Sequence, residues 1–195
     1  MFDQVLKAMT GSSLDLTFVV SDDEDLLERA ARMGAEPVLE ASPSGSSRAV
    51  SLGNERALTG GAEASMVAFS DVPLLTSQEV DRILDFAPEG GRYVVACRSR
   101  RGGTNVLFRR PPSVIPNRYG KNSFINHRSE AENAGVPFLE YRSEAVSLDV
   151  DTVDDLVALK DMERASAELS PICRLLSGKS GALPMEESSW QDRES

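Results

Sequence analysis

Short apolar runs that alternate with helical segments constrain the fold of this chain more than any other feature of its sequence. The runs "LTFVV" (16–20), "ASMVAF" (64–69) and "RYVVAC" (92–97) have the length of buried strands and are followed by polar or turn-forming residues. The stretches between such runs, for example residues 2–10, carry apolar residues at helical spacing. Strands that alternate with helices predict a mixed, mostly parallel sheet with helices on both faces, which is a three-layer, Rossmann-like α/β fold.

The same spacing predicts the individual elements. Helices are expected at 2–10, at 22–34, through Ala49, Leu52 and Ala57, from Thr76 or Ser77 onward, at 122–134 and at 153–164; strands are expected at 16–20, 36–40, 64–69, 92–97, 104–110, 137–141 and 146–150. Ser21 and Glu24 have the spacing of a capping box for the second helix. The strand at 104–110 is expected to be antiparallel to its neighbour, because the short link before it cannot hold a crossover helix.

The chain has 195 residues, which is enough for one domain with a buried core. We expect residues 1–176 to form that domain. Residues 177–195 are rich in Gly, Ser, Pro and Glu, and we expect them to be a disordered tail.

Charge and apolar content exclude several classes of partner. The formal net charge is −10, from 21 basic and 31 acidic residues, and a nucleic-acid-binding surface needs a basic stripe that this sequence lacks. No apolar run reaches the roughly 18 residues of a membrane span. Cys97 and Cys173 lack metal-ligand spacing and indicate a reducing compartment. We therefore expect a cytoplasmic protein with no nucleic-acid or membrane partner; a homodimer stays open.

A carboxylate, Asp71, follows the apolar run 64–69, on a turn that contains Pro73. In open α/β sheets, ligands bind beyond the carboxyl ends of the strands. Asp71 is therefore either a ligand-binding residue or the cap of the next helix, and its position alone leaves both alternatives open.

A second carboxylate cluster occurs in "SLDVDTVDDL" (147–156). In an extended segment Asp149 and Asp151 point to the same side, where their charges repel unless a cation binds. Mg²⁺ uses few protein carboxylates and completes its shell with water and phosphate oxygens. The alternative places Asp151 at a helix start, where Thr152 and Asp155 fit an N-cap and its partner, and leaves Asp149 in solvent.

Four motifs in order carry a family resemblance over almost all of residues 1–162. "SDVPLL" and "LDVDTVDDL" resemble the metal-binding segments of nucleotidyltransferases with a GT-A-like fold. "GGTNVLFRRP" (102–111) and "NRYGKNSFINHRSEAENAGVP" (117–137) are similar to the 2-phospho-L-lactate and phosphoenolpyruvate guanylyltransferases of coenzyme F-420 biosynthesis.

The resemblance implies a reaction in which a phosphate oxygen of a phosphorylated carboxylic acid attacks the α-phosphorus of GTP and pyrophosphate leaves. It implies that Asp71, with Asp149 or Asp151, binds catalytic Mg²⁺. It also implies that Thr104, Gly120 and Ser123 bind the phosphate and carboxylate of the acceptor, which is 2-phospho-L-lactate, phosphoenolpyruvate or a similar acid.

Several residues near these motifs keep two interpretations. Gly102 and Gly103 also suit a plain hairpin turn, and Ser123 also suits a helix cap. His127, one turn after Ser123, either contributes to the anion pocket or packs. The arginines of this region either neutralise pyrophosphate or form a solvated basic turn; they are Arg98, Arg100 and Arg101.

The chain departs from the family pattern at its start and in one internal stretch. Family members begin with a strand and a basic loop around the triphosphate, whereas this sequence opens on the helix "MFDQVLKAMTG". The expectation is therefore either an enzyme whose start lies upstream or a non-catalytic or regulatory relative that keeps the phospho-acid pocket without GTP binding. Gly53 and Asn54 stand where the family contacts the base, in an altered register.

Overall fold

The structure is a computed structural model that describes residues 1–42, 44–162 and 164. The chain divides into two compact units, Met1–Asp155 and Leu156–Ser195. Residues 153–162 are helical, as expected from the sequence, and this helix crosses the boundary between the units. The expected tail at 177–195 lies outside the described residues. The following account concerns the first unit.

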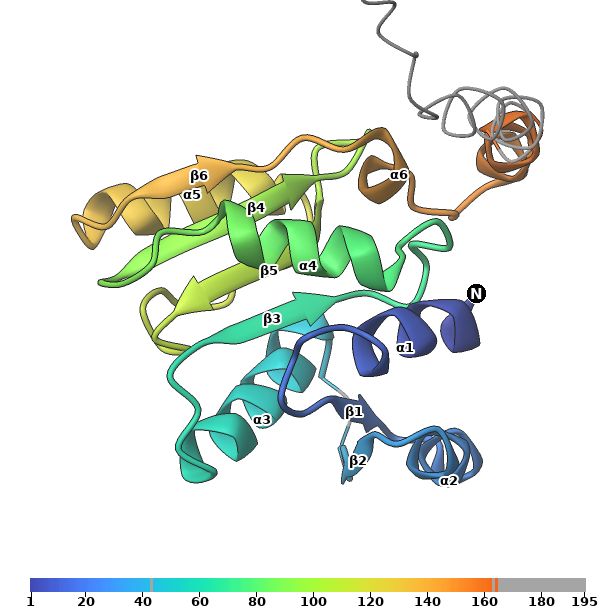
Figure 1. The fold of residues 1–195 in the computed structure, drawn as a ribbon, viewed down its shortest axis with the longest axis horizontal. Coiled ribbons are helices and arrows are strands. Elements are labelled where there is room, and N and C mark those ends of the chain that lie inside the picture. The colour runs from blue at the N-terminus through green and yellow to red at the C-terminus, as the bar shows by residue number, and fades with distance from the viewer. Residues whose placement is uncertain (43, 163, 165–195) are drawn as a thin grey trace, which may run out of the picture. The chain divides into compact units, whose positions relative to one another are not determined.

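Helices and strands alternate along most of the first unit (Figure 1). The helices are α1 (Phe2–Thr10), α2 (Glu24–Arg32), α3 (Ser46–Thr59), α4 (Ser77–Phe86), α5 (Ser123–Asn133) and α6 (Glu144–Ser147). The strands are β1 (Phe18–Ser21), β2 (Glu36–Leu39), β3 (Ser65–Ala68), β4 (Tyr93–Arg98), β5 (Thr104–Arg110) and β6 (Phe138–Glu140). In the part of the chain that the structure describes, no helix has both the length and the apolarity to cross a bilayer.

The strands form two sheets. In one, β1 and β2 pair in parallel; in the other, the order is β3-β5-β4-β6, with β4 and β6 parallel and β5 antiparallel to both of its neighbours. The antiparallel orientation of β5 is confirmed, since the short turn between β4 and β5 permits only a hairpin. No ladder joins β1 to β3, and both of these strands are half-buried along their whole length.

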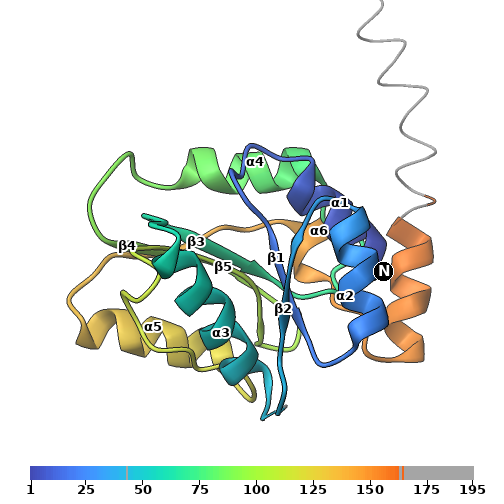
Figure 2. The ribbon, with the colours of Figure 1, turned by 90° about the horizontal axis from the view of Figure 1, so that it is seen from below.

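Helices cover the four-stranded sheet on both faces, which confirms the three-layer α/β expectation. Figure 2 shows α4 on one side of this sheet and α5 on the other. Val95 of β4 packs in one core with Ile83 of α4, whereas Val94 packs in the other core with Phe124 of α5. Successive side chains of a strand point to opposite faces, so one apolar strand supplies both cores.

Two local expectations are wrong. Asp23, not Ser21, caps α2: its side chain accepts a hydrogen bond from the Leu26 backbone N–H at 3.0 Å, while Ser21 belongs to β1 and accepts from the Asp23 N–H. The segment 146–150 is not a strand. Its first residues end α6, and Ser143 caps that helix by accepting from the Val146 N–H. By contrast, Thr76 caps α4 as expected.

Candidate active site

Asp71 lies in the loop that follows β3, and buried neighbours hold this loop in place. Val72 and Leu75 are buried in the core beneath α4. The Asp71 carbonyl oxygen accepts a hydrogen bond of 3.0 Å from the Val150 N–H. This backbone bond brings the two acidic segments of the sequence together at the carboxyl end of β3.

The carboxylates of these two segments lie close enough to repel one another. Burial raises the pKa of the Asp71 carboxyl, and the charges of Asp151 and Asp149 raise it further, while a backbone hydrogen bond lowers it in part. Asp71 Oδ1 is buried and has no hydrogen-bond partner among the residues that the structure describes. A buried acceptor without a donor costs free energy, and a cation at this place would remove that cost.

The arrangement fits an open cation site rather than a closed cage. Among residues 1–42, 44–162 and 164, no group of three or more Asp, Glu, His or Cys side chains is arranged to hold a metal ion. Mg²⁺ commonly uses only one or two protein carboxylates and takes its other ligands from water and phosphate. The unpaired oxygen of Asp71 beside a second acidic segment matches that requirement.

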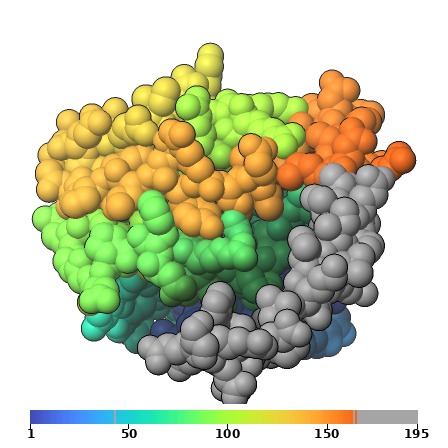
Figure 3. Space-filling model, turned by 45° about the horizontal axis from the view of Figure 1, so that its top comes forward, coloured from blue at the N-terminus to red at the C-terminus, as the bar shows by residue number. Residues whose placement is uncertain are grey.

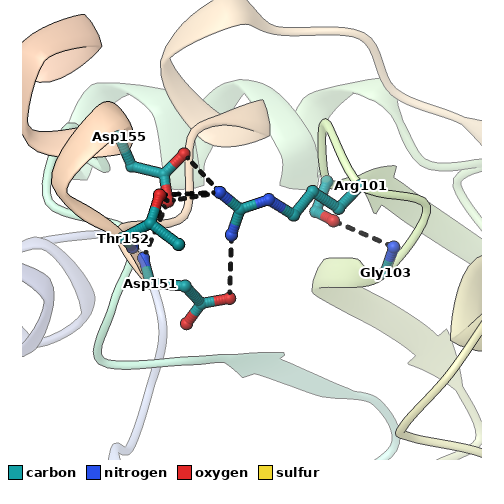
Figure 4. A network of polar contacts seen from close by, with 6 residues as sticks. Arg101, Gly103, Asp151, Thr152 and Asp155 are labelled. Carbon is teal, nitrogen blue, oxygen red and sulfur yellow. Dashed lines mark hydrogen bonds and ion pairs between the residues drawn. The ribbon is translucent and has the colours of Figure 1, made fainter.

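Arg101, in the turn between β4 and β5, reaches across to the second acidic segment (Figure 4). Its guanidinium lies 3.4 Å from the Asp151 carboxylate and 2.7 Å from that of Asp155, and it donates to the Thr152 hydroxyl at 2.9 Å. Asp155 also accepts from the Thr152 N–H at 2.8 Å, so the expected pairing of these two residues at the helix start is present.

This network distinguishes Asp151, which it engages, from Asp149, which it leaves out. Hydrogen bonds, first from the Thr152 hydroxyl and then from backbone N–H groups and Arg101, lower the pKa of Asp155 to about 2 and keep it ionised. Asp151 shares the positive charge of Arg101. Within the described chain, Asp149 has no hydrogen bond or ion pair of its own and remains available to a ligand.

The predicted acceptor-binding residues form a buried hydroxyl pair beside the same turn. Thr104, at the start of β5, and Ser123, at the start of α5, are both buried, and their hydroxyl oxygens lie 3.2 Å apart. Gly120 lies just before the helix, with φ of 114°, and its carbonyl accepts from the Ser123 N–H at 3.2 Å. The structure thus brings all three residues to the N-terminus of α5, where the partial positive charge of the helix favours an anion.

Gly103 supports this pair through close packing. Its N–H donates to Ser99 Oγ at 2.9 Å, and an added Cβ would stand only 2.9 Å from that oxygen and 3.9 Å from Ser123 Oγ. Gly102 is held by its carbonyl, which accepts a 3.4 Å bond from the Phe124 N–H of α5. The glycines therefore allow the turn to approach the hydroxyl groups. Ser99 was missed in the sequence, where a serine before a basic turn carries no distinguishing signal.

His127 lies behind the hydroxyl pair and is fully buried. Its Nδ1 is 3.1 Å from Thr104 Oγ1, and its Nε2 accepts from the Arg118 N–H at 3.0 Å. The ring also makes an edge contact with Tyr119, with 4.8 Å between the ring centroids. His127 therefore packs in the interior and also contacts Thr104 of the predicted acceptor pocket.

A cavity of about 380 Å³ opens beside these groups, at the carboxyl ends of β4 and β6. Its lining residues are Arg98, Ser99, Arg100, Glu140, Tyr141, Arg142, Ser143, Glu144 and Ser147. Arg100 forms an ion pair with Glu144, and Arg142 forms one with Glu140. Of the three arginines named in the sequence, Arg100 and Arg101 pair with carboxylates, whereas Arg98 lies over the Phe124 ring; all three remain exposed to solvent. Yellow-green residues near position 100 lie on the same face as orange residues near 150 in the space-filling view (Figure 3).

Comparison with solved structures bears out the fold. A cytidylyltransferase from Leptospira borgpetersenii serovar Hardjo-bovis (strain JB197) superposes with a TM-score of 0.60 at 15% identity, over 94% of this chain and 87% of that one. This likeness shows an α/β fold that the chain shares with a nucleotidyltransferase.

The family follows from sequence. Residues 1–163 match the model described as "Guanylyl transferase CofC like", and the chain belongs to that family. A phosphoenolpyruvate guanylyltransferase from Sphaerobacter thermophilus is 34% identical over 160 residues, which are 82% of this chain and 76% of that protein. A 2-phospho-L-lactate guanylyltransferase from Methanothermobacter thermautotrophicus is 34% identical over 154 residues, 73% of this chain and 62% of that protein.

Proposed function

We propose that this protein is a Mg²⁺-dependent guanylyltransferase that transfers GMP from GTP to a small phosphorylated carboxylic acid, with release of pyrophosphate, in coenzyme F-420 biosynthesis. The acceptor class is phosphoenolpyruvate or 2-phospho-L-lactate, the acids named for the relatives. The observation that carries the proposal is the juxtaposition, around one turn, of a carboxylate cluster and a buried hydroxyl pair.

Asp71 and Asp149 would hold the metal ion. Asp71 contributes a buried oxygen without a partner among the described residues, and Asp149, unlike Asp151 and Asp155, is not paired with Arg101. When bound, Mg²⁺ would neutralise charge on the phosphate oxygens of the nucleotide. Asp151 would act mainly through Arg101, which fixes the segment that carries Asp149.

The acceptor would bind at the N-terminus of α5. Thr104 and Ser123 offer hydroxyl groups, and the loop at Gly120 allows an anion to approach the backbone. A phosphate and a carboxylate on one small molecule are both anions, so hydrogen-bond donors and a partial positive charge suit both ends of it.

The proposed transfer then requires mainly that the acceptor and GTP are held in the correct relative positions. The acceptor phosphate is already ionised, so its oxygen can attack the α-phosphorus of GTP without a general base. The bond to the bridging oxygen of pyrophosphate breaks as the new phosphoanhydride bond forms. Catalysis comes from alignment of the two substrates and from charge neutralisation.

The direct test is a pyrophosphate-release assay with the purified chain. Phosphoenolpyruvate, 2-phospho-L-lactate and 3-phosphoglycerate are each combined with GTP, ATP and CTP, with Mg²⁺ and with excess chelator. We expect release with GTP and one of the first two acids, and none after chelation. Calorimetric binding of an acceptor without pyrophosphate release under any condition would favour the non-catalytic relative. The absence of both acceptor binding and pyrophosphate release would contradict the proposal.

A further inference from the structure

His127 is the one histidine of the sequence, and its protonation state follows from its neighbours. A backbone amide can only donate, so the Arg118 N–H requires an unprotonated Nε2. The neutral ring must then carry its proton on Nδ1. Nδ1–H therefore donates to Thr104 Oγ1, 3.1 Å away.

This tautomer controls how many donors the hydroxyl pair can offer. Thr104 and Ser123 together carry two hydroxyl protons, and the 3.2 Å bond between them uses one. Because the ring already supplies the proton of the His127–Thr104 bond, the second hydroxyl proton remains free for a ligand. With the ring proton on Nε2, Thr104 would donate to the ring and Ser123 to Thr104, and no hydroxyl proton would remain.

The surroundings keep the ring neutral and fixed. Burial, and next the positive charge of Arg109 on β5, lower the pKa of His127 to about 4; Arg118 lowers it further and Glu130 on α5 raises it. The edge contact with Tyr119 restricts rotation of the ring. At neutral pH the residue is thus a permanent single donor to Thr104.

We propose that His127 is a positioning residue whose Nδ1–H keeps one hydroxyl proton of the Thr104–Ser123 pair directed to the anionic acceptor. The inference rests on the proposed function, because it takes this pair as part of the acceptor site. His127 acts through Thr104 and contacts no substrate. Its removal should therefore weaken acceptor binding and leave nucleotide binding unchanged.

A matched pair of substitutions separates this role from packing. In His127→Asn the side-chain amide can occupy the place of Nδ1 and still donate to Thr104. In His127→Gln the amide reaches the place of Nε2 and keeps the bond from Arg118, but the donor to Thr104 is lost. We expect His127→Gln to raise the KM and Kd for phosphoenolpyruvate or 2-phospho-L-lactate by about 10- to 100-fold, with the KM for GTP unchanged. For His127→Asn, the acceptor KM and Kd should stay within about threefold of the wild-type values, a smaller effect than the loss of one hydrogen bond.

Nuclear magnetic resonance of the wild-type chain tests the premise without activity or mutation. Long-range ¹H–¹⁵N spectra of the single histidine should show a protonated Nδ1 and an unprotonated Nε2. An Nε2–H tautomer would overturn the inference, as would equal losses in both variants or a fall in kcat at constant acceptor KM. If the wild type binds the acceptor by calorimetry but transfers no GMP, the proposed function fails while the comparison of acceptor Kd values still decides the role of His127. Absence of acceptor binding in the wild type would overturn both.

Discussion

At the scale of single residues, the carboxyl of Asp71 lies where burial and neighbouring charges disfavour its ionised form. Its carboxylate is desolvated and faces two others, and its Oδ1 has no partner. Asp71→Asn should therefore stabilise the metal-free protein, by about 0.5–2 kcal/mol, while it abolishes Mg²⁺-dependent nucleotide binding. Thermal unfolding and calorimetry measure the two effects. Asp85→Asn, at an exposed site on α4, serves as the control and should change neither the stability nor the nucleotide binding. Unchanged metal dependence of nucleotide binding in Asp71→Asn would assign Asp71 a purely structural role.

Arg109 is a second residue whose charge the fold does not compensate. It is fully buried in β5, and its Nη1 donates to the Ile115 carbonyl at 3.3 Å. Neither Nε nor Nη2 has a hydrogen-bond partner within the described part of the chain. Burial lowers the pKa of this guanidinium. Replacement by a flexible apolar side chain, Arg109→Met, should raise stability by about 1–3 kcal/mol in denaturant unfolding. Arg110→Met, at a partly exposed residue paired with Glu63, should change the free energy of unfolding by less than about 1 kcal/mol. A large loss of stability in Arg109→Met would instead indicate a buried anion or water that Arg109 binds.

At the scale of elements, the start of α2 gives a specific test of the corrected cap. Asp23 accepts from the Leu26 N–H, so Asp23→Ala should cost about 1 kcal/mol of unfolding free energy. Asp22→Ala, at the exposed neighbouring position, should cost less than about 0.5 kcal/mol. Equal costs for the two substitutions would show that the cap contributes nothing.

Most elements could be predicted because their signals are local, and the errors arose where local signals compete. Residues 21–23 are all of types that cap helices, so the sequence allows more than one helix start. Only the backbone geometry selects Asp23 as the cap. At 146–150, alternating apolar residues resembled a strand, but the serine cap at 143 formed a short helix instead. In the candidate site, the convergence of Asp71 with the second acidic segment was predicted, whereas the pairing of Asp151 with Arg101 was not. Both contacts join residues distant in sequence; the position of Asp71 after a strand and the family resemblance indicate the first, whereas no pattern in the sequence indicates the second.

At the scale of the whole first unit, the two sheets should differ in local stability. β1 and β2 are half-buried or exposed and, among the described strands, pair only with each other, while β4 and β5 are buried in the four-stranded sheet. Few buried contacts lower the free energy of local opening. Amide hydrogen exchange should therefore be faster in β1 and β2 than at the centre of β4 and β5. Equal protection across both sheets would show that they open as one unit.

The turn between β4 and β5 contacts both halves of the candidate site. Arg101 binds the acidic segment, and Gly102 and Gly103 are bonded to α5 and Ser99 beside the hydroxyl pair. If the two substrates bind as proposed, displacement of this turn by one of them would move residues that contact the other. Thermodynamic linkage then makes the effect reciprocal: the factor by which the acceptor changes the affinity for the metal–nucleotide complex equals the factor by which that complex changes the affinity for the acceptor.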